Sequence, residues 1–298
     1  MIDVASNPDP LITLARAIRH DVAFDTAAKT YVAQVIAWRR SMGLFNRVGT
    51  NVAFHITNYV VYLHLSAQAG QIEHGATFSR LLAICEARGN CGSRALRTIL
   101  TGLTLVGQLR KTNAANDKRV QVYVPADSLL QHARTYYGFS LTVLDVIFGD
   151  THYGVAIGRD PAFLANNVAR IGKAIIEDGV VITESFPVLH DIINKAGGLP
   201  TSISIADAQM HGIRPPAAKA IARDFSLSTS QVGHVIAQLA ERGLISRNCD
   251  GDIVDASPLV DQHLGLLARE IALHVKYGVG AEARVIGVGC PARMSAGH

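Results

Sequence analysis

Hydrophobic residues recur at helical spacing along most of the chain, which predicts a mainly helical protein. Leu11, Leu14, Ala15 and Ile18 would share one face of a helix that opens at Asp9-Pro10. The same spacing, bounded by glycine and proline signals, predicts further helices over residues 26–42, 46–68, 78–87, 126–137, 140–148, 161–178, 186–196, 202–210, 215–224, 228–242 and 258–277.

One segment of about twenty residues occurs twice. Residues 91–111 read CGSRALRTILTGLTLVGQLRK, residues 227–247 read LSTSQVGHVIAQLAERGLISR, and a shift of about 136 positions superimposes them. The matched pairs are Ser93 with Thr229, Leu96 with Val232, Ile99 with Val235, Leu100 with Ile236, Leu103 with Leu239, Gly107 with Gly243 and Leu109 with Ile245. Each copy predicts a capped amphipathic helix, a glycine stop and a polar hairpin.

The residues around the first copy predict two helices joined by a short turn. Thr77 can cap helix 78–87, Gly89-Asn90 makes the turn, and Ser93 can cap the next helix. The alternating segment RVQVYV favours a strand, so residues 109–124 predict a two-stranded hairpin.

The second copy has the same order of signals. Pro215-Pro216 would start a helix, Phe225-Ser226-Leu227 would form the turn, and Ser228 would cap the following helix. Residues 245–254, with Asp250-Gly251 at the tip, predict a shorter hairpin.

Length and composition fit two globular domains. The chain has 298 residues, 49% of them hydrophobic, and a mean hydropathy of +0.21, which excludes a disordered chain. We expect an N-terminal half, 1–149, whose repeat unit spans 76–125. We expect a C-terminal half, 150–277, whose unit spans 200–257, followed by a flexible tail over 278–298.

Positive charge is concentrated around the first copy. Residues 76–119 carry eight basic and two acidic side chains, whereas residues 212–253 carry five basic and four acidic ones. A local basic surface on a nearly neutral body is typical of a DNA-binding protein. The first copy is therefore expected to make the stronger DNA contact.

The exposed faces of the two copies supply the candidate DNA-binding residues. Arginine matches guanine bidentately and glutamine suits adenine, whereas threonine can contact phosphate or the thymine methyl group. The candidates are Arg94, Arg97, Thr98 and Thr101 in the first helix, Lys118 and Arg119 in the first hairpin, Ser230, Gln231 and His234 in the second helix, and Arg247 in the second hairpin.

The second copy resembles the helix-turn-helix of MarR-type transcriptional regulators, a family of winged-helix proteins. The resemblance rests on SLSTSQVGHVIAQLAERGLI and QLAERGLISRN (residues 238–248), and more weakly on residues 107–110. It implies a mainly α fold with small β-wings and tandem winged helix-turn-helix units that bind double-stranded DNA. One departure is that no arginine follows Asp250-Gly251-Asp252, where the family usually has an acid-x-Arg pattern.

The resemblance also implies a pseudo-two-fold assembly, because protomers of that family dimerise through their terminal helices. The chain would then be two fused protomers acting as a pseudo-dimeric monomer, with a homodimer as the alternative. It further implies a small organic effector between the helical body and the DNA-reading lobes. Trp38, His55, Tyr59 and Tyr62 would line such a pocket, although an ordinary core or interface explains them more simply.

Other functions remain open alternatives: a plasmid-type replication initiator, a winged-helix scaffold for protein interactions, or an enzyme. Asp150, His152 and Tyr153 cluster in GDTHYG and could form an acid–base site, but a polar linker explains them better. No nucleophile elbow, P-loop or dinucleotide fingerprint is present, so we expect neither catalysis nor a cofactor.

The remaining sequence signals favour a cytoplasmic protein without metal. The four cysteines, Cys85, Cys91, Cys249 and Cys290, form no Cys-x-x-Cys pair and are expected to be reduced. Cys85 and Cys91 flank the first turn and could act as a redox switch, although a core role for Cys85 is the simpler interpretation. No secretory signal is visible, and residues 50–67 predict a buried helix rather than a membrane span.

Overall fold

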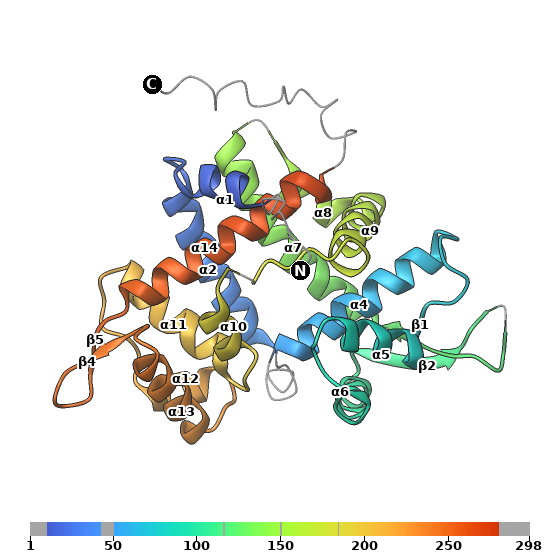
Figure 1. Cartoon of the computed structure of the whole chain (residues 1–298). Coiled ribbons are helices and arrows are strands. Elements are labelled where there is room, and N and C mark those ends of the chain that lie inside the picture. Colours follow the sequence, from blue (N-terminus) through green and yellow to red (C-terminus); the bar gives the residue numbers. More distant parts are fainter. Residues whose placement is uncertain (1–10, 43–50, 116, 150, 184, 280–298) are drawn as a thin grey trace, which may run out of the picture.

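The computed structural model describes residues 11–42, 51–115, 117–149, 151–183 and 185–279. Within these ranges the chain is mainly helical, with one three-stranded and one two-stranded antiparallel sheet (Figure 1). The predicted mainly α architecture with small β-hairpins is confirmed. No helix in the described ranges is both long and apolar enough to cross a bilayer.

The first half of the chain contains helices and a three-stranded sheet whose strand order is β1-β3-β2. Its elements are α1 (Ile12–Arg19), α2 (Phe24–Ser41), α4 (Asn51–Gln68), β1 (Ala76–Thr77), α5 (Phe78–Ala87), α6 (Ser93–Leu105), β2 (Leu109–Asn113), β3 (Gln121–Pro125) and α7 (Asp127–Phe148).

The second half has a similar order of elements with a smaller sheet, in which β4 pairs with β5. Its elements are α8 (Tyr153–Arg159), α9 (Pro161–Ile176), α10 (Pro187–Ile193), α11 (Gly198–Met210), α12 (Ala218–Asp224), α13 (Thr229–Glu241), β4 (Ser246–Arg247), β5 (Ile253–Asp255), α14 (Ser257–Leu273) and the π-helix η1 (His274–Gly278).

Most predicted helices are present, and the differences have local causes. The two helices predicted over 126–137 and 140–148 are one helix, α7, because burial of Tyr137, Leu141 and Leu144 offsets the cost of Gly138 within it. The predicted start at Pro215-Pro216 is wrong, since these prolines lie in an extended segment and α12 begins at Ala218. The predicted opening at Asp9-Pro10 and the tail from residue 280 lie outside the described residues.

The sequence repeat is also a repeat of structure. Helices α6 and α13 both have 13 residues, and each is followed by a glycine with positive φ: +74° at Gly107 and +71° at Gly243. The next amide donates back to the helix at 2.9 Å in both copies, from Gln108 to Leu103 and from Leu244 to Leu239. Each helix therefore ends with the same glycine-dependent motif before its hairpin.

The two halves exchange helices rather than folding as separate modules. In the body, α1 of the first half packs on α14 of the second, and α8 packs on α7. Likewise α2 packs on α11, and α9 packs on α4. The repeat relates α1 to α8 and α14 to α7, so the first two pairs are equivalent. It likewise relates α2 to α9 and α11 to α4, so the last two pairs are equivalent. The interpretation of GDTHYG (residues 149–154) as a polar linker is wrong from Tyr153 onwards, because Tyr153 begins α8, which packs against α7.

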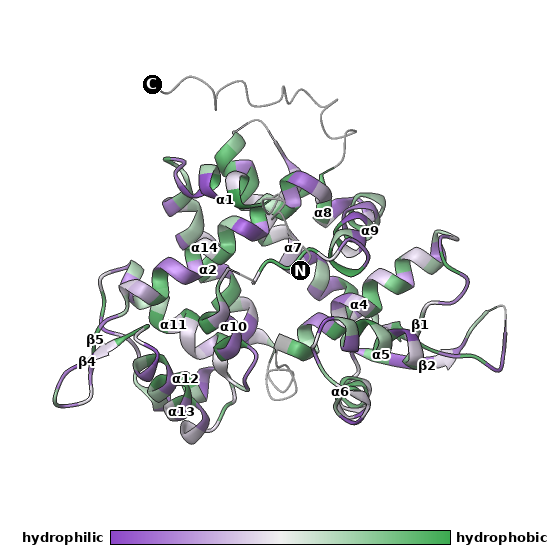
Figure 2. Cartoon of the chain, in the orientation of Figure 1, coloured by the Kyte–Doolittle hydropathy of each residue, from purple (hydrophilic) through white to green (hydrophobic). Residues whose placement is uncertain are grey.

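This exchange places α6 and α13 on one side of the molecule and the two hairpins at its opposite ends (Figure 1). Figure 2 shows hydrophobic and hydrophilic residues alternating along most helices, as expected of amphipathic helices around a shared core. The predicted buried helix around residues 50–67 is α4, whose Ile56 and Val60 are fully buried.

Candidate nucleic-acid interface

The first unit consists of α5, a turn, α6 and the β2–β3 hairpin. Thr77 caps α5 as predicted, its hydroxyl accepting from the Arg80 amide at 3.2 Å. Gly89 turns the chain with φ +63°. Helix α6 begins at Ser93 without a side-chain cap, so the predicted capping role of Ser93 is wrong and Gly92 holds that position.

Helix α6 buries one face and exposes the other. Leu96, Leu100 and Leu103 are fully buried, as their spacing predicts. Its exposed face carries the four predicted side chains, Arg94, Arg97, Thr98 and Thr101. The Arg97 guanidinium lies 4.7 Å from the centre of the Phe78 ring, which orients it along the α5 side of the helix.

The hairpin beside α6 carries further positive charge. Leu109 to Asn113 pair with Pro125 to Gln121 in antiparallel register. Lys118 and Arg119 are exposed at the turn, and the Arg119 amide donates to the Asp117 carboxylate at 2.9 Å. The Val120 amide also donates to the Asp117 carbonyl at 3.0 Å, so Asp117 holds the turn that carries both basic residues.

The second unit has the same shape, but its polar groups are engaged within the unit. Ser228 and Gln231 form a capping box, in which the Gln231 amide oxygen accepts from the Ser228 amide at 2.9 Å. The predicted cap at Ser228 is confirmed. This bond occupies the oxygen through which Gln231 would contact adenine. His234 is likewise hydrogen-bonded to Gln238 at 2.8 Å, whereas Ser230 is exposed.

The second hairpin is also internally paired. Arg247 donates to the Gly251 carbonyl at 2.8 Å, and Arg214 forms an ion pair with Asp252 at 2.7 Å. Arg247 is exposed, but it braces its own hairpin. The ten candidate residues are thus all exposed, and the first unit combines them with a much larger excess of positive charge than the second.

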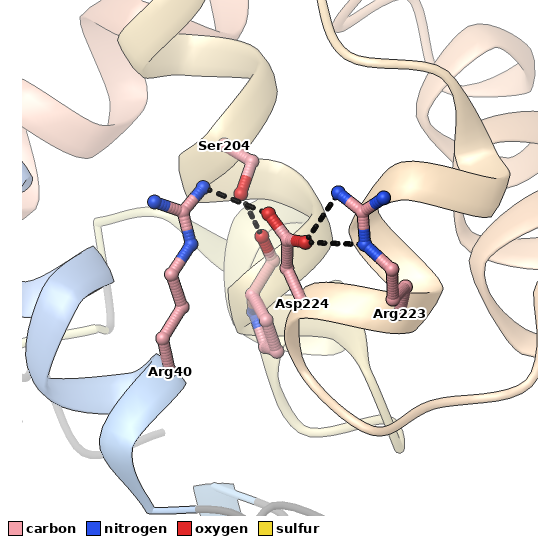
Figure 3. Close-up of polar contacts among 5 residues, drawn as sticks. Arg40, Ser204, Arg223 and Asp224 are labelled. Carbon is pink, nitrogen blue, oxygen red and sulfur yellow. Dashed lines mark hydrogen bonds and ion pairs between the residues drawn. The ribbon is translucent and has the colours of Figure 1, made fainter.

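Contacts between the two halves hold the second unit on the body and join α4 to α9. Arg40 on α2 forms an ion pair with Asp224 at 3.1 Å, and Arg223 binds the other oxygen of the same carboxylate (Figure 3). On the other side, the Tyr62 ring packs directly against Gly172 of α9, and its hydroxyl donates to Glu177 at 2.7 Å. The first contact ties the second unit to α2, and the second ties α4, which packs on α5 and β3 of the first unit, to α9.

The alternative candidate sites are placed differently. His55, Tyr59 and Tyr62 line one cavity, whereas Trp38 lines a neighbouring one. Tyr153 is buried and stacks on Phe163, which turns its ring into the core, while His152 is exposed at the start of α8. Asp150 lies outside the described residues. Within the described ranges, no three His, Cys, Asp or Glu side chains form a group that could hold a metal ion.

Sequence reasoning missed Glu270, a carboxyl group buried in the body. Its only sequence signal is that it is an acidic residue within the mostly apolar segment GLLAREIALHV (residues 265–275). It also missed Asn90 as a contact between the first turn and α4, where its side chain donates to the Tyr59 hydroxyl at 3.0 Å.

Comparison with known proteins finds no family model, no curated protein and no solved structure that matches this chain.

Proposed function

We propose that this protein is a transcriptional regulator that binds double-stranded DNA through two winged helix-turn-helix units in one chain. The observation that carries the proposal is the structural repeat: two helix–turn–helix–hairpin units whose second helices, α6 and α13, lie on the same side of the body (Figure 1). Recognition helices enter the major groove with their N-terminal side chains at the base edges, and hairpins contact the flanking backbone.

The charge distribution supports unequal roles for the two units. Arg94, Arg97, Lys118 and Arg119 give the first unit an exposed cationic surface that can bind phosphates and guanine. In the second unit, Gln231 and Arg247 are already hydrogen-bonded within the unit. The first unit supplies most of the affinity, and the second adds a weaker contact with a different sequence.

The exchanged helices support a pseudo-dimeric monomer. A homodimeric regulator presents two identical helices to a palindromic site. This chain presents two unlike helices from one polypeptide, so its target is a pair of unlike half-sites.

The proposal predicts saturable, sequence-specific binding of one chain to one duplex. The experiment is selection of bound fragments from the source genome at two salt concentrations, followed by titration and light scattering on the recovered duplex. We expect affinity at least about 1,000-fold above that for a shuffled duplex, as specific DNA-binding proteins show. Equal affinity for the two duplexes would leave an interaction scaffold as the better explanation. Recovery of a single plasmid origin instead of promoters would favour a replication initiator.

Removing the charges at the first hairpin should weaken binding without changing its specificity. Because each phosphate contact contributes about 0.9 to the slope of log affinity against log salt, Lys118→Ala with Arg119→Ala should reduce that slope by about 2. The measurement is duplex titration across a salt series, for both specific and shuffled sequences. An unchanged slope would mean that the hairpin does not contact the phosphate backbone of the DNA.

A further inference from the structure

The second unit lacks a strand that the first unit has. In the first unit β1 pairs with β3, and its last residue, Thr77, caps α5. Ala217 holds the same cap position before α12, so residues 215–217 stand where β1 stands in the first unit. They are extended but form no strand, since Pro215 and Pro216 have no amide hydrogen to donate. Within the described residues 185–279, β5 therefore pairs with β4 alone.

The backbone groups of Ile253 face the unpaired edge of β5. Asp252, just before β5, accepts at its carbonyl from the Asn248 amide at 3.0 Å and donates its amide to the Asn248 side chain at 2.8 Å. Successive residues of an antiparallel strand direct their N–H and C=O groups to opposite edges, so those of Ile253 point away from β4. The residue at the same distance before the next helix in the first unit is Tyr123, which pairs with Ala76 of β1.

A groove of about 550 Å³ lies between this edge and the proline segment. The residues of α13 that line it are Gly233 and the half-buried Ile236. A Cβ at Gly233 would meet nothing within 4 Å, so the groove is open on the α13 side. Two large apolar side chains next to lining residues are exposed, Ile213 at 61% and Val254 at 60%. The groove thus offers both backbone groups and apolar surface to a ligand.

The charged residues that line the groove are two arginines and one aspartate: Arg214, Arg247 and Asp252. Arg214 pairs with Asp252 at 2.7 Å, yet its side chain is 77% exposed. Exposed ion pairs of this kind are weak, so a carboxylate of a ligand can replace Asp252 at little cost. Arg247 adds a second positive charge beside it. The groove therefore favours an acidic ligand over a basic one.

We propose that this groove binds an extended acidic peptide segment of a partner protein, which adds a third strand to the β4–β5 sheet. The peptide backbone would pair with Ile253, its apolar side chains would contact Ile236 and the prolines, and a carboxylate would lie beside Arg214. Main-chain bonds supply the affinity of such complexes, and alternate side chains supply the specificity.

The first unit provides the precedent for this contact, because β1 covers the corresponding edge of its own sheet. A peptide strand satisfies both the donor and the acceptor of Ile253, whereas a DNA backbone offers acceptors alone. The inference rests on the groove and not on DNA binding. If the proposed function holds, the partner is held next to α13, the second recognition helix.

The test titrates the full chain by fluorescence anisotropy with three labelled peptides of equal length. One alternates valine and threonine between terminal glutamates, one has lysines in place of the glutamates, and one is the acidic peptide N-methylated at its central residues. We expect the acidic peptide to bind at least about tenfold more tightly than either of the others, because the groove is cationic and a strand needs its amide hydrogens. Equal affinities, or no saturable binding at millimolar concentration, would overturn the proposal.

A leucine at Gly233 would fill the groove from α13. Gly233→Leu should weaken the acidic peptide at least about tenfold, and leucine is a good helix former, so α13 should keep its fold. Gly158→Leu is the matched control: Gly158 lies on α8, a Cβ there also meets nothing within 4 Å, and peptide affinity should change less than about twofold. Equal effects of the two variants would mean that the peptide binds elsewhere.

Two further variants separate the charge of the groove from its structure. Both break the ion pair of Arg214 with Asp252, but they should act in opposite directions. Asp252→Asn releases Arg214 and should strengthen acidic peptide binding about threefold or more, whereas Arg214→Ala should reduce the preference for the acidic over the basic peptide below about threefold. Weaker binding of the acidic peptide to both variants would contradict the role of Arg214.

Duplex titration of the same variants distinguishes this proposal from the proposed function. Failure of the chain to bind any DNA would overturn the proposed function and leave the peptide result intact. Weaker duplex binding by Gly233→Leu, with unchanged peptide affinity, would assign the groove to the DNA interface and overturn the peptide proposal.

Discussion

Replacing Arg94 and Arg97 together with alanine is expected to weaken binding of the selected duplex at least about 100-fold. Each arginine lies on the exposed face of α6, one helical turn from the other, and can form a bidentate contact with guanine. Such a contact contributes about 1–3 kcal/mol, and 1.4 kcal/mol corresponds to tenfold in affinity. Titration at one fixed salt concentration, with the specific and the shuffled duplex, measures both the affinity and the specificity lost.

A matched control removes two arginines from the body. Arg16 on α1 and Arg159 on α8 are exposed. Helices α1 and α8 correspond to each other in the two halves and lie away from α6 and α13 (Figure 1). Arg16→Ala with Arg159→Ala changes the net charge equally and should alter affinity less than about threefold. If both double variants weaken binding to the same extent, the effect is due to net charge and α6 is not the reading helix.

The repeat and its local signals could be predicted from the sequence, because they depend on neighbours along the chain. Leu96, Leu103, Val232 and Leu239 are buried as their helical spacing requires. The stop at Gly107 and the cap at Ser228 follow from the positive φ that glycine tolerates and the hydroxyl acceptor that serine offers. The same reasoning failed at Ser93, because Gly92 holds the cap position there. These signals located both helix–hairpin units.

The exchange of helices between the halves could not be predicted in the same way. Nothing local distinguishes α1 packing on α14 from α1 packing within its own half, because both arrangements bury the same apolar face. The capping role of Gln231, by contrast, was a missed signal, because Ser228 and Gln231 stand at the spacing of a capping box.

The cavity lined by His55, Tyr59 and Tyr62 shows the same limit more strongly. Its carboxylate, Glu270, binds hydroxyl groups from Tyr31, Tyr136 and Ser140, which lie on two other helices far away in the chain. The sequence placed Tyr59 and Tyr62 on one helix face but gave no reason to prefer a pocket over an ordinary core. Only the meeting of α4, α7, α9 and α14 leaves space between these aromatic rings.

The placement of the second unit depends on a turn of two glycines between α10 and α11. Gly197 has φ +76° and lies against Leu227, which is in the turn between α12 and α13. Gly198 begins α11, and a Cβ there would be 1.8 Å from the carbonyl oxygen of Ile192. Since that oxygen belongs to the backbone at the end of α10, no side-chain rotation can relieve the overlap.

Gly198→Ala is therefore expected to lower the free energy of unfolding by about 3 kcal/mol or more, because α10 and α11 must separate. Gly233→Ala is the matched control: Gly233 is within α13, and a Cβ there meets nothing within 4 Å, so alanine should raise stability by up to about 1 kcal/mol. Urea denaturation followed by circular dichroism measures both. Equal midpoints for the two variants would mean that this turn can open at little cost, and α11 would then not fix the second unit on the body.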